Sequence, residues 1–330
     1  MIYNSLLSIV IPTYNRVDFL DYCLKFHIPL AREYNIQIFI SDNASTDLTK
    51  IVVEKWMKEY PLLKYHQNAS NVGPDRNFEI GLKLPDTEYI WLLGDTYQIP
   101  KNGIKYLLEQ TKDKKYDALV FNLANKINIE TKNYQESNLL LNELGALMTC
   151  LSCLVYNKEL IKRANFSRYY NSYFIQIGII FEDIADNKKF SVFWIKSESV
   201  EGLEHPLLKK TNWSETSKVY DIACDSWTNF VMSLPPSYKL QHKMKCIMDF
   251  GKISGLFTLK NLVMLRILGL LNIEILKKYK FFFGMTIDYP IYLIYIISVM
   301  PKIVCKMIVI QYILFLKKDK KNKIITIWKR

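Results

Sequence analysis

The stretch Glu88-Tyr89-Ile90-Trp91-Leu92-Leu93-Gly94-Asp95 is an apolar run that ends abruptly in a glycine and a carboxylate. Its β-forming residues predict a buried strand with a polar tip at Gly94-Asp95. In open α/β sheets, ligands bind beyond the carboxyl ends of the strands, so an acidic group there can hold a cation or face a phosphate-bearing ligand. A plain turn that begins at Gly94 is the alternative.

Two further polar turns follow predicted strands upstream. Residues 6–11 run into Pro12-Thr13-Tyr14-Asn15-Arg16, and residues 36–40 run into a segment that contains Asp42, Asn43, Ser45 and Asp47. A loop over residues 68–77 adds Gly73 and the guanidinium of Arg76. A carboxylate can accept from a base N–H or a ribose hydroxyl, while basic side chains and backbone amides can donate to a diphosphate. These turns together predict a nucleotide site.

Alternating strands and helices position these turns. Apolar runs predict strands at 6–11, 36–40, 63–66, 88–93, 118–121, 151–156 and 190–195, and helical spacing is found at 17–31, 48–60, 78–84 and 104–110, from 158, and within 169–186. The short connections favour an α/β fold class, with a mostly parallel, doubly wound sheet and helices on both faces.

The last third of the chain has a different composition. After about residue 212 the pattern is helical, so we expect an α/β domain at 1–215 and a helical region at 216–330. Two apolar, tyrosine-rich segments in 289–316 are interrupted by Pro301, Lys302 and Lys306, and neither reaches the roughly 18–20 apolar residues that span a bilayer. The formal charge is +12, and many of the lysines lie in the last thirty residues. This pattern favours helices lying on an anionic membrane surface, with buried core helices or a short spanning helix as alternatives.

The polar segments, in this order, resemble the family 2 glycosyltransferases, which have the nucleotide-sugar-binding fold called GT-A. The resemblance rests on Ser8 to Arg16, Ile40 to Asp47, Asn71-Val72-Gly73 with Arg76-Asn77, and Trp91 to Asp95, and it weakens after about residue 110. It implies a nucleoside-diphosphate sugar donor, with UDP as the expected nucleotide. The residues implied to hold that donor are Pro12, Thr13, Tyr14, Asn15, Arg16, Asp42, Asn43, Ser45, Gly73, Arg76, Asn77, Gly94 and Asp95.

The resemblance also implies a divalent cation, Mg²⁺ or Mn²⁺, that bridges the diphosphate. The family holds this ion with a D-x-D or D-D motif at the fourth strand, whereas this chain reads Gly94-Asp95-Thr96-Tyr97 and keeps only the first carboxylate. Two interpretations follow. Asp95 holds the metal largely through phosphates and water, or the site is impaired.

A later carboxylate acts as general base in the family, where it takes the proton from the acceptor hydroxyl. Such a group contributes roughly 10²–10⁴-fold to the rate. The candidates by position are Asp183 and Glu182, although an adjacent Glu-Asp pair on a helix is more often an exposed pair.

Several other classes are disfavoured by the sequence. The turn after the first strand has no glycine, unlike the G-x-G-x-x-G of dinucleotide-dependent dehydrogenases or the glycine-rich loop of sugar nucleotidyltransferases, and the Q-x-x-R-W of processive synthases is missing. Basic residues cluster beside apolar helices and are not interleaved with exposed aromatics, which disfavours nucleic acid as a partner. A catalytically impaired protein that binds a membrane or a partner is the main alternative to an enzyme.

The expected location is the cytoplasmic face of the bacterial cell membrane. The start of the chain has no secretory signal pattern, and the six scattered cysteines are typical of a reduced compartment. A peripheral enzyme there would meet a lipid-linked glycan acceptor.

Overall fold

The computed structural model describes residues 3–185, 187, 189–205, 207–208 and 213–315. The chain divides into two compact units, Met1–Lys210 with Asn229–Cys246, and Thr211–Thr228 with Ile247–Arg330. We call them the first unit and the second unit. Each unit consists of two separate segments of the chain, so neither is a single continuous stretch. The domain boundary expected near residue 215 stays a prediction.

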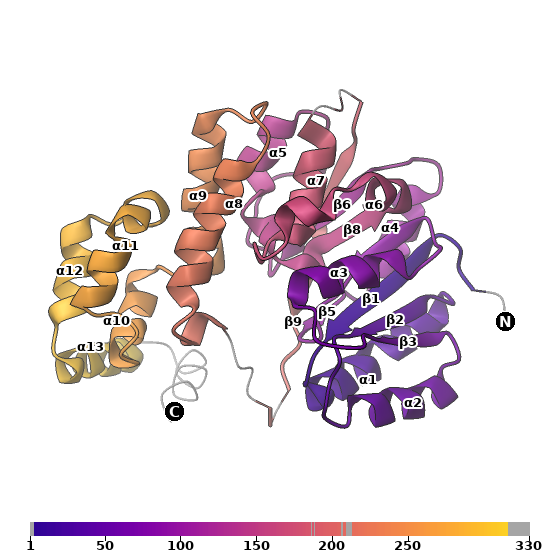
Figure 1. The fold of residues 1–330 in the computed structure, drawn as a ribbon, viewed down its shortest axis with the longest axis horizontal. Helices are drawn as coiled ribbons and strands as arrows, with labels where there is room; N and C mark the ends of the chain where they lie inside the picture. The colour runs from indigo at the N-terminus through magenta and orange to yellow at the C-terminus, as the bar shows by residue number, and fades with distance from the viewer. Residues whose placement is uncertain (1–2, 186, 188, 206, 209–212, 316–330) are drawn as a thin grey trace. The chain divides into compact units, whose positions relative to one another are not determined.

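The first unit contains one mixed sheet with the strand order β3-β2-β1-β4-β8-β6-β9-β5, and β7 pairs with β9 (Figure 1). The strands are β1 (Leu7–Thr13), β2 (Gln37–Asp42), β3 (Leu63–Gln67), β4 (Tyr89–Leu92), β5 (Tyr97–Gln98), β6 (Ala118–Leu123), β7 (Lys132–Tyr134), β8 (Leu154–Asn157) and β9 (Val192–Gly202).

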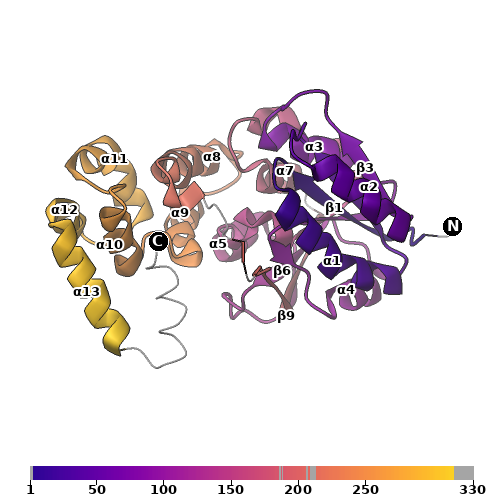
Figure 2. The same ribbon diagram turned by 90° about the horizontal axis from the view of Figure 1, so that it is seen from below.

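The α-helices of the described residues are α1 (Val17–Glu33), α2 (Thr49–Glu59), α3 (Pro74–Lys83), α4 (Gly103–Thr111), α5 (Ser137–Leu144), α6 (Lys158–Arg163), α7 (Ile175–Ala185), α8 (Trp227–Ser233), α9 (Leu240–Ser254), α10 (Leu259–Ile267), α11 (Ile273–Thr286), α12 (Ile291–Val299) and α13 (Lys302–Phe315). Figure 1 shows α3 on one face of β1 and β2, with α1 and α2 on the other. Figure 2 shows α4 beside α1, where the two helices line a shared groove that includes Leu30 and Leu108.

The parallel half of the sheet creates a single functional edge. Strands β3, β2, β1 and β4 pair in parallel, so their carboxyl ends lie side by side. Strand β1 is buried along its whole length because both of its faces are covered, which explains why most of its residues are apolar. The carboxyl edge of β1–β4 is therefore where the three polar strand tips meet. We call it the site edge.

The predicted α/β class with helices on both faces is confirmed, with two differences in detail. Strand β8 runs antiparallel to both β4 and β6, so the sheet is mixed beyond β4. Helix α3 begins at Pro74, four residues before the predicted start at 78. Proline suits the first helical turn because its missing N–H has no partner there in any case, and Gly73 has φ 84°, which a glycine adopts without strain.

The predicted helical nature of the C-terminal region is also confirmed as far as the structure describes it. In the second unit, Val309 of α13 packs against Val263, Met264 and Ile267 of α10. Among the described residues, no single helix has the length and apolar character to cross a membrane. Ile291–Val299 and Lys302–Tyr312 reach that length only as a pair, and they are bent by 109°. The lysine cluster predicted at 317–330 lies outside the described residues.

Candidate nucleotide-sugar site

The turns after β1 and β2 are joined by backbone and side-chain hydrogen bonds. Thr13 and Asp42 are register partners at the ends of the two strands. The backbone N–H of Asn15 donates to Ser45 Oγ at 2.8 Å, and the backbone N–H of Thr46 donates to Asn15 Oδ1 at 2.7 Å. Asn15 has φ 50°, a conformation that asparagine tolerates better than most residues. The first two predicted turns therefore form one continuous surface at the site edge.

Asp42 lies at the centre of this surface with its carboxylate held in a fixed orientation. It is fully buried, and its Oδ1 accepts from the backbone N–H of Ser45 at 2.9 Å. Its Oδ2 accepts from Tyr65 Oη at 2.6 Å and from Gln67 Nε2 at 3.2 Å. Burial and the neighbouring Asp42 carboxylate raise the pKa of Tyr65. Tyr65 therefore remains a donor to Asp42 at neutral pH, a contact that the sequence did not reveal.

The predicted residues Asn43 and Asn77 connect β2 to the loop that precedes α3. Asn43 Oδ1 accepts from Asn68 Nδ2 at 3.1 Å and from the backbone N–H of Val72 at 2.9 Å. Asn77 Nδ2 donates to the carbonyl of Ser41 at 2.9 Å, and its Oδ1 accepts from Asn68 Nδ2 at 3.0 Å. The side-chain amides of Asn43 and Asn77 are both hydrogen-bonded to Asn68 and to backbone groups. Their contribution within this structure is therefore to position the loop.

The tip of β4 brings Asp95 to Arg16. Arg16 Nε lies 3.3 Å from Asp95 Oδ2, and the guanidinium carbon lies 4.8 Å from the centroid of the Phe19 ring. Asp95 is 5% exposed, whereas the Arg16 side chain is 34% exposed. The backbone N–H of Gly94 donates to Ser152 Oγ at 3.0 Å, so the short turn before β8 supports the tip of β4. No sequence motif around Ser152 could have predicted this supporting contact.

A buried histidine supports the segment after Asp95. His27 on α1 is fully buried; its Nδ1 donates to the carbonyl of Cys23 at 2.7 Å, and its Nε2 accepts from the backbone N–H of Ile99 at 3.1 Å. These two contacts define a neutral imidazole protonated at Nδ1. Burial lowers the pKa of His27 to about 4. His27 is thus a neutral connector between α1 and the residues that follow Asp95.

The donor set at this tip does not fit a metal site built from protein ligands. Asp95 contributes one carboxylate, and that carboxylate pairs with Arg16. Thr96 and Tyr97 occupy the positions where the family has further carboxylates. In the part of the chain that the structure describes, no group of three or more His, Cys, Asp or Glu side chains could hold a metal ion. Among the described residues, Asp95 therefore does not belong to a set of His, Cys, Asp or Glu side chains that could hold the predicted metal ion.

The start of α3 packs against the segment that precedes α7. The Arg76 guanidinium carbon lies 4.8 Å from the centroid of the Tyr170 ring. Asp75 Oδ2 accepts from the backbone N–H of Tyr173 at 3.3 Å, and burial raises the pKa of Asp75 to about 6. Both Asn171 and Tyr173 have φ above 60°, which costs energy for a tyrosine. Asp75 therefore stabilises a strained turn beside Arg76, a role that sequence reasoning missed.

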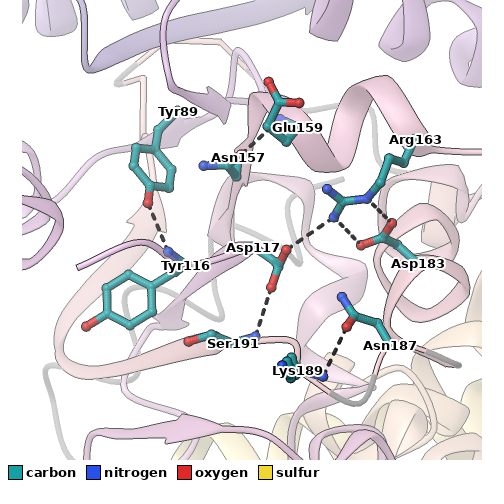
Figure 3. Close-up of polar contacts among 10 residues, drawn as sticks. All are labelled: Tyr89, Tyr116, Asp117, Asn157, Glu159, Arg163, Asp183, Asn187, Lys189 and Ser191. Carbon is teal, nitrogen blue, oxygen red and sulfur yellow. Dashed lines mark hydrogen bonds and ion pairs between the residues drawn. The ribbon is translucent and has the colours of Figure 1, made fainter.

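Asp183 does not lie at the site edge, which argues against its predicted role as general base. Its carboxylate accepts from Arg163 Nε at 2.9 Å and Nη2 at 2.8 Å, and Arg163 Nη2 also donates to Asp117 at 3.2 Å (Figure 3). Asp117 precedes β6, and its carbonyl accepts from the N–H of Asn157, the register partner of Tyr89 at the beginning of β4. Asp183 is therefore at the amino edge of the parallel strands, opposite Asp95.

Glu182 is also committed to neighbours away from the strand tips. Its Oε1 accepts from Arg168 Nη1 at 2.7 Å, and its Oε2 accepts from Tyr169 Oη at 2.6 Å. Helix α7 contacts the turn that precedes β8 through Gln176, whose Nε2 donates to the carbonyl of Thr149. Glu182 follows Gln176 by six residues, or about 9 Å along a helix. Neither predicted base is thus free to reach an acceptor hydroxyl at the site edge.

A mixed α/β sheet with a parallel half, an oriented carboxylate at the second strand tip and an arginine–aspartate pair between the first and fourth tips form an arrangement of the GT-A class. The model of the family described as Glycosyl transferase family 2 matches residues 8–180, a little over half of the chain. The chain belongs to this family.

Two curated relatives illustrate the range of the family. The abequosyltransferase RfbV of Salmonella typhimurium is 39% identical over 106 residues, which cover 31% of this chain and 31% of that protein. The GalNAc(5)-diNAcBac-PP-undecaprenol beta-1,3-glucosyltransferase of Campylobacter jejuni is 29% identical over 108 residues, which cover 32% of this chain and 35% of that protein. The similarity thus spans about a third of the length of each.

Two solved structures share the fold over most of the chain. The mannosyltransferase PcManGT of Pyrobaculum calidifontis, in complex with GDP-Man and Mn²⁺, has a TM-score of 0.54 at 12% identity and covers 91% of this chain and 88% of that one. S. aureus TarS 1–349, in complex with UDP-GlcNAc, has a TM-score of 0.52 at 16% identity and covers 78% and 74%. At such low identity, these likenesses describe the fold alone.

Proposed function

We propose that the protein is a glycosyltransferase that transfers one sugar from a nucleoside-diphosphate sugar, with UDP as the expected nucleotide, to a glycan acceptor. The observation that carries this proposal is the convergence of Asp42 and the Arg16–Asp95 pair at one sheet edge, within the region that matches the family. A carboxylate such as that of Asp42 can accept from a base or a ribose hydroxyl, and Arg16 is a donor suited to a diphosphate.

The proposed reaction is a single displacement that inverts the anomeric carbon. An acceptor hydroxyl oxygen forms a bond to that carbon, and the bond from the carbon to the diphosphate oxygen breaks. The electron pair of the broken bond stays on the departing nucleoside diphosphate, and the hydroxyl proton passes to a general base. Positive groups near the leaving group stabilise the charge that develops on it.

The proposed acceptor is a glycan carried on a polyprenyl diphosphate. The Campylobacter jejuni relative has a PP-undecaprenol acceptor in its name, which supports the same class here. The proposed location is the cytoplasmic face of the bacterial membrane. A peripheral attachment is supported by helices α12 and α13, which expose Tyr292, Tyr295, Ile303 and Met307 by half or more.

A screen of sugar nucleotides tests the proposed function. The parent protein is incubated with UDP-, GDP-, CDP- and dTDP-sugars, with and without detergent-dispersed polyprenyl-diphosphate glycans, and the released nucleoside diphosphate is measured. We expect release with one donor class and faster release when an acceptor is added. The Asp42→Ala variant is the matched control and should release much less.

A catalytically impaired binding protein is the second candidate, and the missing carboxylates at Thr96 and Tyr97 favour it. Under this alternative, nucleotide binding would persist while no donor or acceptor combination released nucleoside diphosphate. Equal release by the parent and by Asp42→Ala would instead contradict the assignment of the site.

A further inference from the structure

We propose that Arg16 is the cation that neutralises the diphosphate of the donor, in place of a divalent metal ion held by Asp95. This inference rests on the proposed function, since it concerns the leaving group of the same donor. The proposal depends on one charge arrangement. Asp95, at the position where the family has a metal ligand, is here the counter-ion of Arg16.

The position of Arg16 suits this role. It lies three residues after the end of β1 at Thr13 and directly precedes Val17, the first residue of α1, so its backbone is held between two rigid elements. Its side chain is oriented by Asp95 on one side and by the Phe19 ring on the other. Because two neighbours restrict the guanidinium, little rotamer entropy is left to lose when a phosphate binds.

The guanidinium also retains donors for a ligand. Asp95 forms an ion pair with Nε, which has no hydrogen-bond acceptor among the described residues, and the Nη1 and Nη2 groups lie beyond Nε at the end of the side chain. With the side chain 34% exposed, these groups can meet a phosphate from the solvent side. The planar fork of an arginine matches two phosphate oxygens, which a lysine ammonium does not.

Asp95 then has a positioning role. Its carboxylate is 5% exposed and keeps the guanidinium at the site edge, much as a second group orients a metal ligand in other sites. His27 and Ser152 in turn stabilise the segment around Asp95 through the backbone N–H groups of Ile99 and Gly94. The site edge thus provides an oriented positive charge without a second carboxylate.

Titration calorimetry with UDP and with uridine, in EDTA and separately in Mn²⁺, tests the proposal. The parent should bind UDP in EDTA within about threefold of its affinity in Mn²⁺. Arg16→Gln should weaken UDP binding by about 10- to 100-fold, the loss expected when a hydrogen bond to a charged group is removed. Uridine binding should change by less than about threefold, because uridine has no diphosphate. The UDP affinity of Arg16→Lys should lie between that of the parent and that of Arg16→Gln.

Arg32→Gln is the matched control, since Arg32 lies at the other end of α1 and its removal changes the net charge equally. It should bind UDP like the parent. A parent that binds UDP only with Mn²⁺ would overturn the Arg16 proposal and leave the proposed function intact. An Arg16→Gln variant that loses uridine and UDP affinity equally would reduce Arg16 to a structural role. If the parent bound neither UDP nor, in a further titration, GDP under either condition, the proposed function itself would fall.

Discussion

The imidazole of His27 accepts a hydrogen bond from the backbone N–H of Ile99 at 3.1 Å, in an interior that excludes water from both residues. The contact joins α1 to the segment that follows Asp95. Its geometry requires a neutral ring, in agreement with a pKa lowered to about 4 by burial. A buried donor that loses its only partner costs more free energy than an exposed one, because water cannot replace the lost bond.

His27→Ala should therefore destabilise the first unit by about 2–4 kcal/mol, from the unpaired Ile99 N–H together with the cavity that the ring leaves. Urea unfolding followed by tryptophan fluorescence measures this loss. His242→Ala is the control, because His242 is only half-buried and its Nδ1 contacts Asn142 on an accessible surface. Equal midpoints for the two variants would contradict a supporting role for His27.

Asp42→Ala should weaken the binding of both UDP and uridine, by about 1–3 kcal/mol, because the carboxylate is expected to contact the nucleoside part. This pattern differs from that of Arg16→Gln, which should affect UDP alone. Tyr65→Phe removes one donor to the carboxylate and should cost about 1 kcal/mol or less in uridine affinity. Calorimetry that gave Asp42→Ala the uridine affinity of the parent would place the nucleoside elsewhere.

Because Asp183 forms an ion pair with Arg163, we expect its substitution to lower stability and to leave turnover nearly unchanged, unlike the substitution of a catalytic base. Asp183→Asn should lower the free energy of unfolding by about 1–2 kcal/mol, since it weakens the contact with Arg163 while Asp117 and solvent still surround the guanidinium. Turnover at saturating donor should stay within about threefold of the parent. A loss of 10²-fold or more in kcat with unchanged stability would restore Asp183 as a base.

Asp75 should give the stability of the protein a distinctive dependence on pH. Its pKa is raised from 3.8 to about 6 by burial, so the folded protein binds the proton more tightly than the unfolded chain does. The resulting stabilisation is complete below pH 3.8 and is lost as the pH rises through 6. His27 acts in the opposite sense: its contribution is complete above pH 6.5 and is lost as the pH falls through 4.

Asp75→Asn removes the first of these titrations. The free energy of unfolding of the parent relative to this variant should therefore increase by about 2 kcal/mol between pH 6.5 and pH 4.5, in line with a shift of about two pKa units. Denaturant unfolding at several pH values measures the difference. Asp113→Asn is the control, because it makes the same change of side chain at an exposed position. A pH-independent difference for Asp75→Asn would mean that Asp75 titrates normally.

The sequence was sufficient to predict the site edge, because the carboxyl ends of neighbouring parallel strands must lie together whatever the details of packing. Thr13, Asp42 and Asp95 could therefore be grouped from the strand pattern alone. The start of α3 was misplaced because Pro74 was taken as part of a loop, although a proline is equally at home in a first helical turn.

The partners of individual side chains could not be predicted in the same way. The pair Glu182-Asp183 was a candidate for the general base by its position in the chain, but Arg163 and Arg168, 20 and 14 residues upstream, determine where the two carboxylates point. His27 and Ser152 act through backbone groups that are remote in sequence, at separations of 72 and 58 residues. Such contacts depend on tertiary packing, which no local pattern records.

The proposed attachment of the second unit to membranes can be tested by point substitutions that leave its interior unchanged. On α13, Cys305 and Val309 are buried, whereas Ile303, Met307 and Ile310 are 63%, 51% and 47% exposed and recur at helical spacing on the outer face. The triple change of these three residues to Gln should preserve the packing of Val309 against α10.

Insertion of half of each of these three side chains into a bilayer interface is worth roughly 2–5 kcal/mol in total. The triple variant should therefore bind vesicles of phosphatidylglycerol and phosphatidylethanolamine at least about 30-fold more weakly than the parent in a flotation assay. Leu48→Gln with Ile51→Gln is the matched control, because these residues, next to and within α2, are both 62% exposed but belong to the first unit. That variant should float like the parent. If the triple variant also floated like the parent, the exposed face of α13 would not be the membrane contact. Attachment would then have to rest on α12 or on electrostatic attraction alone. Salt at 0.5 M would abolish a purely electrostatic attachment, because it shortens the Debye length to about 4 Å.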